Sequence, residues 1–228
     1  MKFFVGLLIG FWTSALVAAD QPNILFIIAD DASRDSFGAY GCQYVKTPGF
    51  DRIAREGVLF TQAYNCNPKC APARACLLTG RYSWQLEEAC NHNPFLSEKW
   101  KFYPYLLEEH GYAIGFTGKG WGPGKYKDGG YSRNPAGPMF SAKKKNSNIK
   151  GISSTDYAAN FNLFLKEKPE GKPFCFWIGG HEPHRVFEKG VGLRKGKKIE
   201  DIAVPAFLPD TPEVRSDILD YYFEIEWF

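Results

Sequence analysis

Short apolar runs alternate with amphipathic segments along most of this chain. Three runs, at residues 23–29, 112–117 and 174–178, are apolar almost throughout, which is typical of strands buried on both faces of a parallel sheet. A shorter strand is expected at residues 58–60. The intervening segments carry apolar side chains at helical spacing, with capping residues or prolines where they begin and glycines where they end. They predict helices at residues 47–57, 70–79, 103–110, 155–166 and 211–227.

Strands that alternate with helices predict an α/β fold, with a central and largely parallel sheet flanked by helices. Polar side chains follow each apolar run where the predicted strand ends. They are Asp30 and Asp31 after the first run, Lys119 after the second, and His181 and His184 after the third. In open α/β sheets, ligands bind outside the carboxyl ends of the strands. We therefore expect these side chains to converge, although they lie far apart in the sequence.

Most of these polar residues also have an ordinary structural interpretation. Two adjacent aspartates favour a hard cation with oxygen ligands, but they also serve as a capping and turn pair. Lys119, which precedes a glycine-rich loop, is by itself typical of a surface lysine. His181 suits a structural hydrogen bond as well as a contact to substrate. An imidazole such as that of His184 is well suited to proton transfer near neutral pH.

The most specific signal is the run Cys-Ala-Pro-Ala-Arg at residues 70–74, followed by Leu-Thr-Gly-Arg at residues 78–81. It resembles the signature of the type I sulfatases, in which the cysteine of C-x-P-x-R is oxidised to formylglycine, the aldehyde that becomes the nucleophile. That family usually has Ser or Thr after the cysteine and Ser before the arginine, where this chain has Ala71 and Ala73. The alternative interpretation of Cys70 is a disulfide partner or a buried thiol. The spacing of the neighbouring cysteines does not favour zinc.

Sulfate chemistry explains why such a modification is needed. A serine that attacks a sulfate ester is left sulfated, and the new ester is hard to hydrolyse. A hydrated aldehyde has two hydroxyls on one carbon, so one attacks sulfur and the other then loses its proton and expels sulfate. Arg74 follows Cys70 by one helical turn and is expected to face the same site. A helix that begins here also directs backbone N–H groups at an anion.

The resemblance covers nearly all of the chain after residue 19 and implies an alkaline-phosphatase-like sandwich fold. It also implies roles for particular residues. The expected catalytic residues are Cys70, Arg74, Lys119 and His184. The expected metal ligands are Asp30, Asp31 and the modified Cys70, which bind calcium or occasionally magnesium. The expected substrate contacts are His181 and Trp121.

Trp121 marks a departure from the family pattern. It stands where the family usually has a histidine that is thought to help deprotonate the formylglycine diol, so the base for that step is left open. Its ring is expected to stack on a sugar instead. The replacement is also the best argument for a catalytically degenerate glycan-binding protein. A second alternative is a phosphoesterase or phosphonate hydrolase of the same superfamily, because phosphate and sulfate are alike in shape.

The segments at residues 181–185 and 210–212 look most like the sulfamidase and heparan N-sulfatase branch of the family. The resemblance therefore implies a sulfatase that removes O-sulfate or N-sulfate from a sulfated polysaccharide or oligosaccharide. It also implies a partner enzyme that generates the formylglycine. The family places further metal ligands and a C-terminal subdomain downstream. We therefore interpret residues 20–228 as the N-terminal part of the catalytic domain, and expect weak or no activity from this part alone.

The N-terminal segment has the features of a signal peptide at residues 1–19. Lys2 is followed by an apolar run that ends in small residues, and the run is short for a bilayer span. We expect an exported protein, periplasmic or secreted, or lysosomal in a eukaryote, without stable membrane insertion. Export permits disulfides, and their pairing is left open. The cysteines concerned are Cys42, Cys66, Cys76, Cys90 and Cys175.

The charge of the chain changes this interpretation little. The net charge of the 228 residues is +3, and no nucleic-acid-binding motif is present in the sequence, so nucleic acid is not an expected partner. Basic residues cluster at residues 143–145 and 194–198. Such clusters are typical of solvated loops, and they also suit a rim that attracts an anionic glycan.

Overall fold

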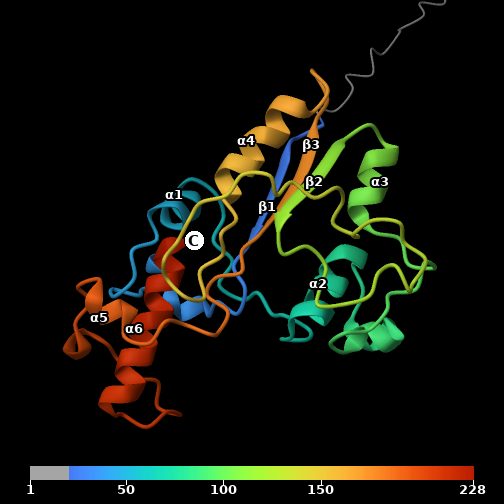
Figure 1. Ribbon diagram of the computed structural model, residues 1–228. Coiled ribbons are helices and arrows are strands. Elements are labelled where there is room, and N and C mark those ends of the chain that lie inside the picture. Colours follow the sequence, from blue (N-terminus) through green and yellow to red (C-terminus); the bar gives the residue numbers. More distant parts are fainter. Residues whose placement is uncertain (1–20) are drawn as a thin grey trace, which may run out of the picture.

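The computed structural model describes residues 21–228, so the predicted signal peptide lies outside the described residues. Three strands form one parallel sheet, with β1 at Ile24–Ile28, β2 at Ala113–Gly118 and β3 at Phe174–Gly179. Their order is β1-β3-β2, and Gly179 pairs with Ile28 on one side and Gly118 on the other. The three carboxyl ends are therefore level with one another (Figure 1). The predicted α/β class and parallel sheet are confirmed.

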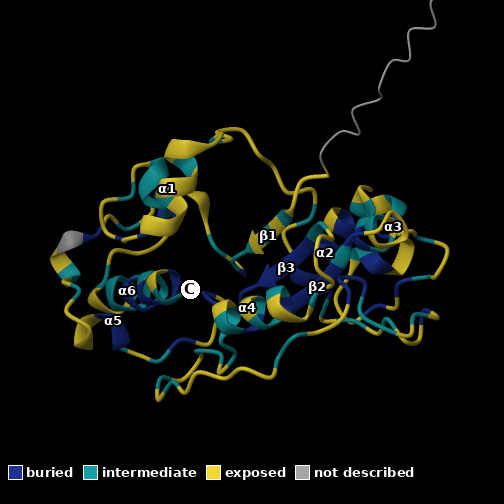
Figure 2. Cartoon of the chain, turned by 90° about the horizontal axis from the view of Figure 1, so that it is seen from above, coloured by how far each residue is buried: buried dark blue, intermediate teal, exposed yellow. Residues whose placement is uncertain are grey.

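One helix, α4 (Tyr157–Glu167), packs on a face of this sheet, and the other helices lie in two groups. Figure 2 shows α2 and α3 beyond one side of the sheet and α1, α5 and α6 on the opposite side. No helix in the described part of the chain is both long and apolar enough to cross a membrane. The α-helices are α1 Pro48–Glu56, α2 Cys70–Thr79, α3 Tyr103–Glu109, α4 Tyr157–Glu167, α5 Val191–Arg194 and α6 Pro212–Trp227.

The two faces of the sheet pack against different helices. Side chains alternate along a strand, so Trp177 of β3 faces the core cluster beneath α2 and α3, whereas Phe176 and Ile178 face α4. Phe164 of α4 packs on Phe176 with ring centroids 4.5 Å apart. Burial of these aromatic rings contributes about 1.5–3 kcal/mol per side chain. Packing of these side chains on both faces of β3 fixes this strand in the centre of the fold.

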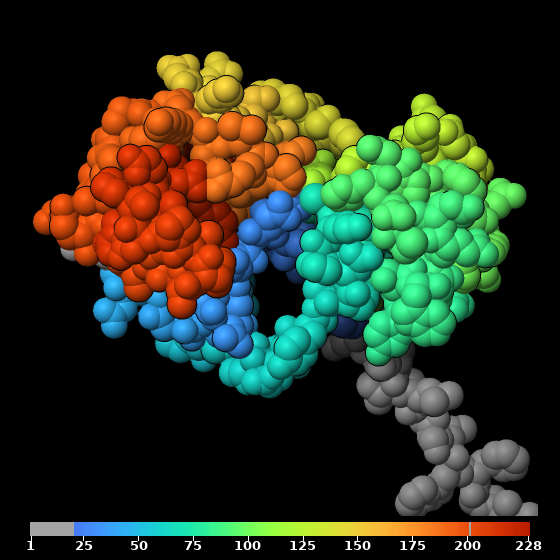
Figure 3. Space-filling model, turned by 90° about the horizontal axis from the view of Figure 1, so that it is seen from below, coloured from blue at the N-terminus to red at the C-terminus, as the bar shows by residue number. Residues whose placement is uncertain are grey.

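Two expectations about strands are wrong. β1 is not buried on both faces, because α4 packs on β2 and β3 and leaves Leu25 and Ile27 of β1 exposed. Residues 58–60 do not form a strand, and Val58 and Phe60 are also exposed. They belong to a segment that leads to α2 and borders an open hollow (Figure 3, cyan to teal). Without a neighbouring strand to pair with, an apolar run of this length stays irregular.

The helix ends follow the sequence signals closely. α2 spans the predicted residues and ends at Gly80, whose φ of 65° lies in the left-handed region that glycine adopts without strain. Thr211 caps α6 by accepting a backbone N–H of the first turn, as predicted. α4 begins later than predicted, because Asp156 rather than Thr155 provides its capping oxygen.

α6 buries two carboxyl groups against the loops that follow β3. Asp220 accepts the backbone N–H groups of Gly190 and Gly192 at 2.7 and 2.8 Å. Glu224 is fully buried, and neither of its carboxyl oxygens has a hydrogen-bond partner among the described residues. Burial, followed by the negative charges of Glu182 and Asp220, raises the pKa of Glu224 to about 8. Glu224 is therefore mostly protonated at neutral pH.

Replacing Glu224 with glutamine is expected to stabilise the protein, and more so as the pH rises. The pKa of Glu224 is higher in the folded state than its usual 4.5, so stability is lost as the pH rises from about 4.5 to about 8. Glutamine does not ionise and avoids this loss. The expected gain in free energy of unfolding is roughly 2–4 kcal/mol at pH 8 and less than about 0.5 kcal/mol at pH 4. Thermal unfolding across this range tests it, and a gain independent of pH would contradict the assignment.

Candidate active site

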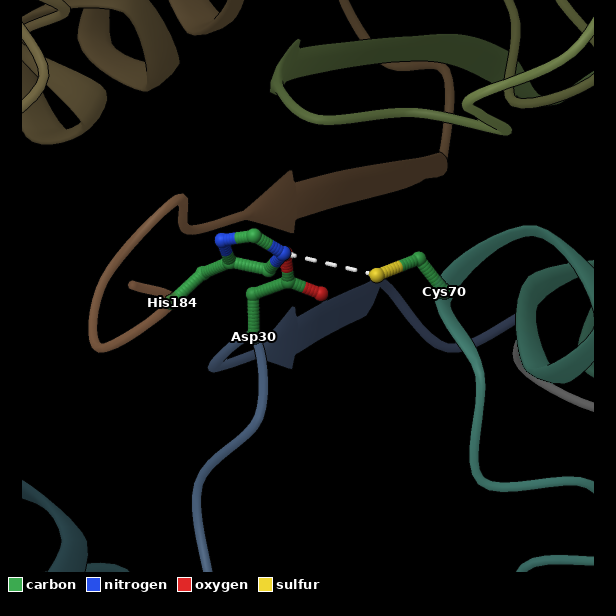
Figure 4. Close-up of side chains that lie close together, drawn as sticks. All are labelled: Asp30, Cys70 and His184. Carbon is green, nitrogen blue, oxygen red and sulfur yellow. Dashed lines mark hydrogen bonds between the residues drawn. The ribbon is translucent and has the colours of Figure 1, made fainter. Parts of the chain in front are cut away.

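Cys70 is the first residue of α2, directly below the carboxyl end of the sheet. Its thiol is buried and points at Asp30, with 3.9 Å between Sγ and Oδ2 (Figure 4). Lys69 before it is extended, so the first turn of α2 begins at Cys70 itself. The free N–H groups of that turn therefore lie at the site, where they favour an anion.

Asp30 is the centre of a buried cluster of charges. Its Oδ1 accepts a hydrogen bond from Arg74 Nη2 at 3.0 Å, and its Oδ2 pairs with the ammonium of Lys119. Burial by itself would raise the pKa of Asp30, but the hydrogen bond from Lys119 and the charges of Arg74 and Lys119 outweigh it. The pKa of Asp30 is therefore lowered below its usual 3.8, and the carboxylate stays ionised.

Arg74 connects the ends of two strands underneath this cluster. Its side chain is fully buried, and Nη1 donates to the carbonyl oxygens of Lys119 and Gly120 at 2.6 and 3.1 Å. Its guanidinium also lies over the ring of Trp177, 5.9 Å from the centroid. The sequence predicted that Arg74 faces the site of Cys70, and the structure places it there. Its contacts are with protein groups, so it holds Asp30 and the Lys119 loop in place.

His184 and Asp31 lie on the exposed side of the site. Nε2 of His184 is 3.7 Å from Oδ2 of Asp31. One atom each of Asp30, Cys70 and His184 lies within 4.8 Å of the others, and Figure 4 shows the imidazole and the thiol on either side of the carboxylate. Asp31 has a φ of 62°, so the backbone turns here through the left-handed region. Tyr221 of α6 secures this turn, because its hydroxyl accepts the N–H of Ser33 at 2.7 Å.

The loop after β3 contains a buried network that the sequence pattern did not indicate. The side chain of Glu182 is fully buried and accepts the N–H of Ser153 and the hydroxyl of Tyr157, each at 2.7 Å. The Tyr157 oxygen accepts the N–H of His181 at 3.0 Å, and the Glu182 carbonyl accepts the N–H of Asp30. This network fixes the segment between the two histidines. In the sequence, the one indication of this network was the position of Glu182 between His181 and Pro183.

The two expected substrate contacts differ, because His181 lies near the charges of the site and Trp121 lies in the core. Desolvation by the surrounding chain, together with the charges of Lys119 and Arg74, lowers the pKa of His181 despite the opposing charges of Glu182 and Asp30. Its imidazole is therefore neutral near pH 7. Trp121 is 3% exposed and packs in the core cluster beneath α2. The expectation that its ring stacks on a sugar does not fit this placement, because both ring faces are covered.

The donor set fits a hard divalent cation. The carboxylates of Asp30 and Asp31 carry oxygen atoms of the kind that such a cation prefers, and Asp31 is open to solvent. Among the described residues, Asp30, Cys70 and His184 form the one group of three or more potential ligand residues. The Cys70 sulfur is the one soft donor in that group, and its conversion to an aldehyde would replace it with oxygen.

The sequence profile of the sulfatase family matches residues 22–201. This chain belongs to the sulfatase family. An N-acetylglucosamine-6-O-sulfatase of Bacteroides thetaiotaomicron is 33% identical to it over 181 residues, covering 72% of this chain and 31% of that protein. Human N-sulphoglucosamine sulphohydrolase is 29% identical over 242 residues, covering 91% and 45% respectively. This sulfatase chain therefore spans less than half the length of either relative.

Solved structures agree on the fold of this sulfatase chain. One, in complex with its substrate D-glucosamine-2-N,6-O-disulfate, matches with a TM-score of 0.58 and 23% identity over 81% of this chain and 39% of that chain. The phosphonate monoester hydrolase of Agrobacterium radiobacter matches with a TM-score of 0.59 and 19% identity over 91% and 57%. The predicted alkaline-phosphatase-like architecture is confirmed by these matches. At such identities, the likeness concerns the fold alone.

Proposed function

We propose that the full-length protein removes sulfate groups from a glycan, with a formylglycine made from Cys70 as the nucleophile. The observation that carries this proposal is the convergence of Cys70, Asp30 and His184 within 4.8 Å, in a chain of the sulfatase family. These residues come from α2 and from the ends of two different strands. Lys119 follows β2, the remaining strand, and pairs with the carboxylate of Asp30. A sulfate beside Cys70 would meet all of them.

Lys119 and His184 are the groups that would contact the sulfate. Lys119 borders the site against Asp30, where its ammonium attracts a sulfate oxygen. His184 lies on the exposed side, so its imidazole is placed to protonate the leaving oxygen or nitrogen of the sugar. His181 contributes a further polar contact. Arg74 stays buried and keeps Asp30 ionised and in position.

Asp30 and Asp31 would hold the divalent cation that the sulfatase family implies, together with an oxygen on the modified Cys70. Calcium and magnesium both prefer such oxygen donors, and we propose calcium. When bound, a divalent cation supplies Lewis-acid stabilisation of the charge on the transferred group. Removal of the cation by a chelator is part of the assay below.

A cavity beside the site supports a glycan as the substrate. It has a volume of about 860 Å³ and reaches from Asp31 to α6. The side chains of Tyr40, Tyr44 and Tyr221 line it, together with the ion pair of Arg185 and Asp217. Aromatic faces suit the apolar faces of sugar rings. The two relatives compared above are named for sulfated glucosamine units, and we extend that substrate class to this protein.

Mass spectrometry of the tryptic peptide of residues 70–74 tests the modification. Cleavage after Lys69 and Arg74 releases Cys70 on a peptide without another cysteine. After expression with a formylglycine-generating enzyme, we expect this peptide to carry CHO in place of CH2SH. The Cys70→Ala variant provides the unmodified reference. A peptide that carries only a free thiol or a disulfide would refute the nucleophile.

Assays of the full-length protein separate this function from its alternatives. We expect hydrolysis of N-sulfoglucosamine, 6-O-sulfo-N-acetylglucosamine or an aryl sulfate, and loss of that activity with a chelator. An aryl phosphonate is the matched substrate for a phosphonate hydrolase, which the second structural likeness keeps as a candidate. Faster turnover of the phosphonate than of each sulfate would favour that reaction. Glycan binding without turnover of any of them would favour a degenerate homologue.

A further inference from the structure

Two cysteines on either side of Cys70 in the sequence lie together on another face of α2. Cys66 precedes the helix and is exposed, whereas Cys76 lies in its second half and is buried. Both line one cavity of about 560 Å³. Within the helix, that cavity is lined by Ala73, Cys76, Leu77 and Gly80, which recur at the spacing of a single helix face.

The two thiols lie near enough in this cavity for the Cys66 thiol to affect the ionisation of Cys76. Burial, followed by this neighbouring thiol, raises the pKa of Cys76 to about 12. The loop that carries Cys66 is anchored as well, because the amide of Asn67 donates to the carbonyl of Cys90 at 3.2 Å. The thiol of Cys70 points elsewhere, toward Asp30.

We propose that Cys66 and Cys76 form a disulfide that secures the loop before α2 and leaves Cys70 as a free thiol for modification. The observations that carry the proposal are the shared cavity, the proximity of the two thiols and the anchored loop. Each thiol is a potential competitor for Cys70, because both are near it in the sequence. Their pairing would remove both competitors. The bridge does not depend on the proposed function of the site.

The bridge forms by ordinary thiol–disulfide exchange with an external disulfide, such as oxidised glutathione. Cys66 is the exposed thiol, so its thiolate attacks the oxidant, forms a mixed disulfide and releases one thiol. Cys76 then gives up its proton and attacks the Cys66 sulfur, which releases the second thiol. The protein loses two electrons and two protons, and the oxidant gains them. The enclosed loop is short and contains Cys70.

Tryptic digestion reads this pairing directly, because the three cysteines fall on separate peptides. Cleavage gives residues 56–69 with Cys66, 70–74 with Cys70, and 75–81 with Cys76. The full chain is equilibrated with oxidised and reduced glutathione, alkylated without prior reduction, and digested. We expect a linked pair of peptides 56–69 and 75–81 that separates on reduction, with the peptide 70–74 unlinked. The Cys42→Ser variant is the matched control and should keep the link.

Two results would overturn the pairing. One is recovery of peptides 56–69 and 75–81 fully alkylated before reduction, and the other is linkage of either peptide to Cys70 or Cys90. A stability measurement adds a second readout. Reduction is expected to lower the Tm of the parent chain by roughly 5–10 °C and to leave the Cys66→Ala/Cys76→Ala variant unchanged. Equal shifts in both proteins would contradict a bridge at this place. The state of Cys70 is read separately, so failure here leaves the formylglycine proposal standing.

Discussion

Replacing Cys70 with serine is expected to lower steady-state hydrolysis of a sulfate ester by at least roughly 10³-fold in the full-length protein. Serine is close to cysteine in size, so it should fit the buried start of α2 and leave the Tm near that of the parent. Its single hydroxyl can attack sulfur but has no second hydroxyl to expel sulfate. The variant should therefore stop after one turnover as a sulfated serine.

The measurement is product released per protein molecule, followed by mass spectrometry of the peptide of residues 70–74. We expect at most one product per molecule and a peptide that is heavier by one sulfo group. Cys90→Ser is the matched control, because Cys90 lies outside the site and should keep the parental rate. Repeated turnover by the Cys70→Ser variant at the parental rate would rule out a formylglycine nucleophile.

Replacing Asp30 with asparagine is expected to destabilise the fold as well as abolish activity. Asp30 is the acidic partner of Arg74, which is fully buried, and of Lys119. Removing one partner of a buried ion pair leaves an uncompensated charge and typically costs about 3–5 kcal/mol. For a chain of this size, such a loss corresponds to a Tm lower by roughly 6–20 °C. Thermal unfolding monitored by circular dichroism measures it.

Asp31 offers the matched control for this prediction. Its side chain is 55% exposed and its ion-pair partner, His184, is exposed as well, so Asp31→Asn should change the free energy of unfolding by less than about 0.5 kcal/mol. If both aspartates hold the cation, both variants lose activity, but only Asp30→Asn loses stability. A stable Asp30→Asn variant would show that Arg74 is compensated by another group. An active Asp31→Asn variant would remove Asp31 from the proposed metal site.

The elements of the fold were predictable where local signals and packing agree. The end of α2 follows from the sequence, because glycine adopts the left-handed conformation after Thr79, whereas Lys69 provides no side-chain cap at its start. The apolar runs of β2 and β3 match their burial. The runs at 23–29 and 58–60 are also apolar, yet the first forms a strand with one exposed face and the second is irregular. Only the positions of neighbouring elements distinguish these cases.

Some features of the candidate site were also predictable from the sequence, and others were not. The sequence predicted the roles of Cys70, Asp30 and His184, because the motif around Cys70 indicates the chemistry. The ends of the predicted strands indicate where the side chains come together. The network of Glu182 and Tyr157 was not visible, because it joins residues of ordinary type through hydrogen bonds between distant segments. Trp121 shows the opposite error, since an aromatic residue in a site motif was expected to face substrate and is buried.

By itself, the sequence of this protein determined its membership of the α/β class, the place of its helix ends and the residues that converge on one site. These depend on local backbone preferences and on the level carboxyl ends of parallel strands. Tertiary structure decided that Arg74 is an internal partner of Asp30, and that Glu224 is buried with no hydrogen-bond partner for its carboxyl oxygens among residues 21–228. It also decided that Cys66 and Cys76 line one cavity. Burial and charge pairing depend on segments that meet only after folding, and no local pattern records which segments those are.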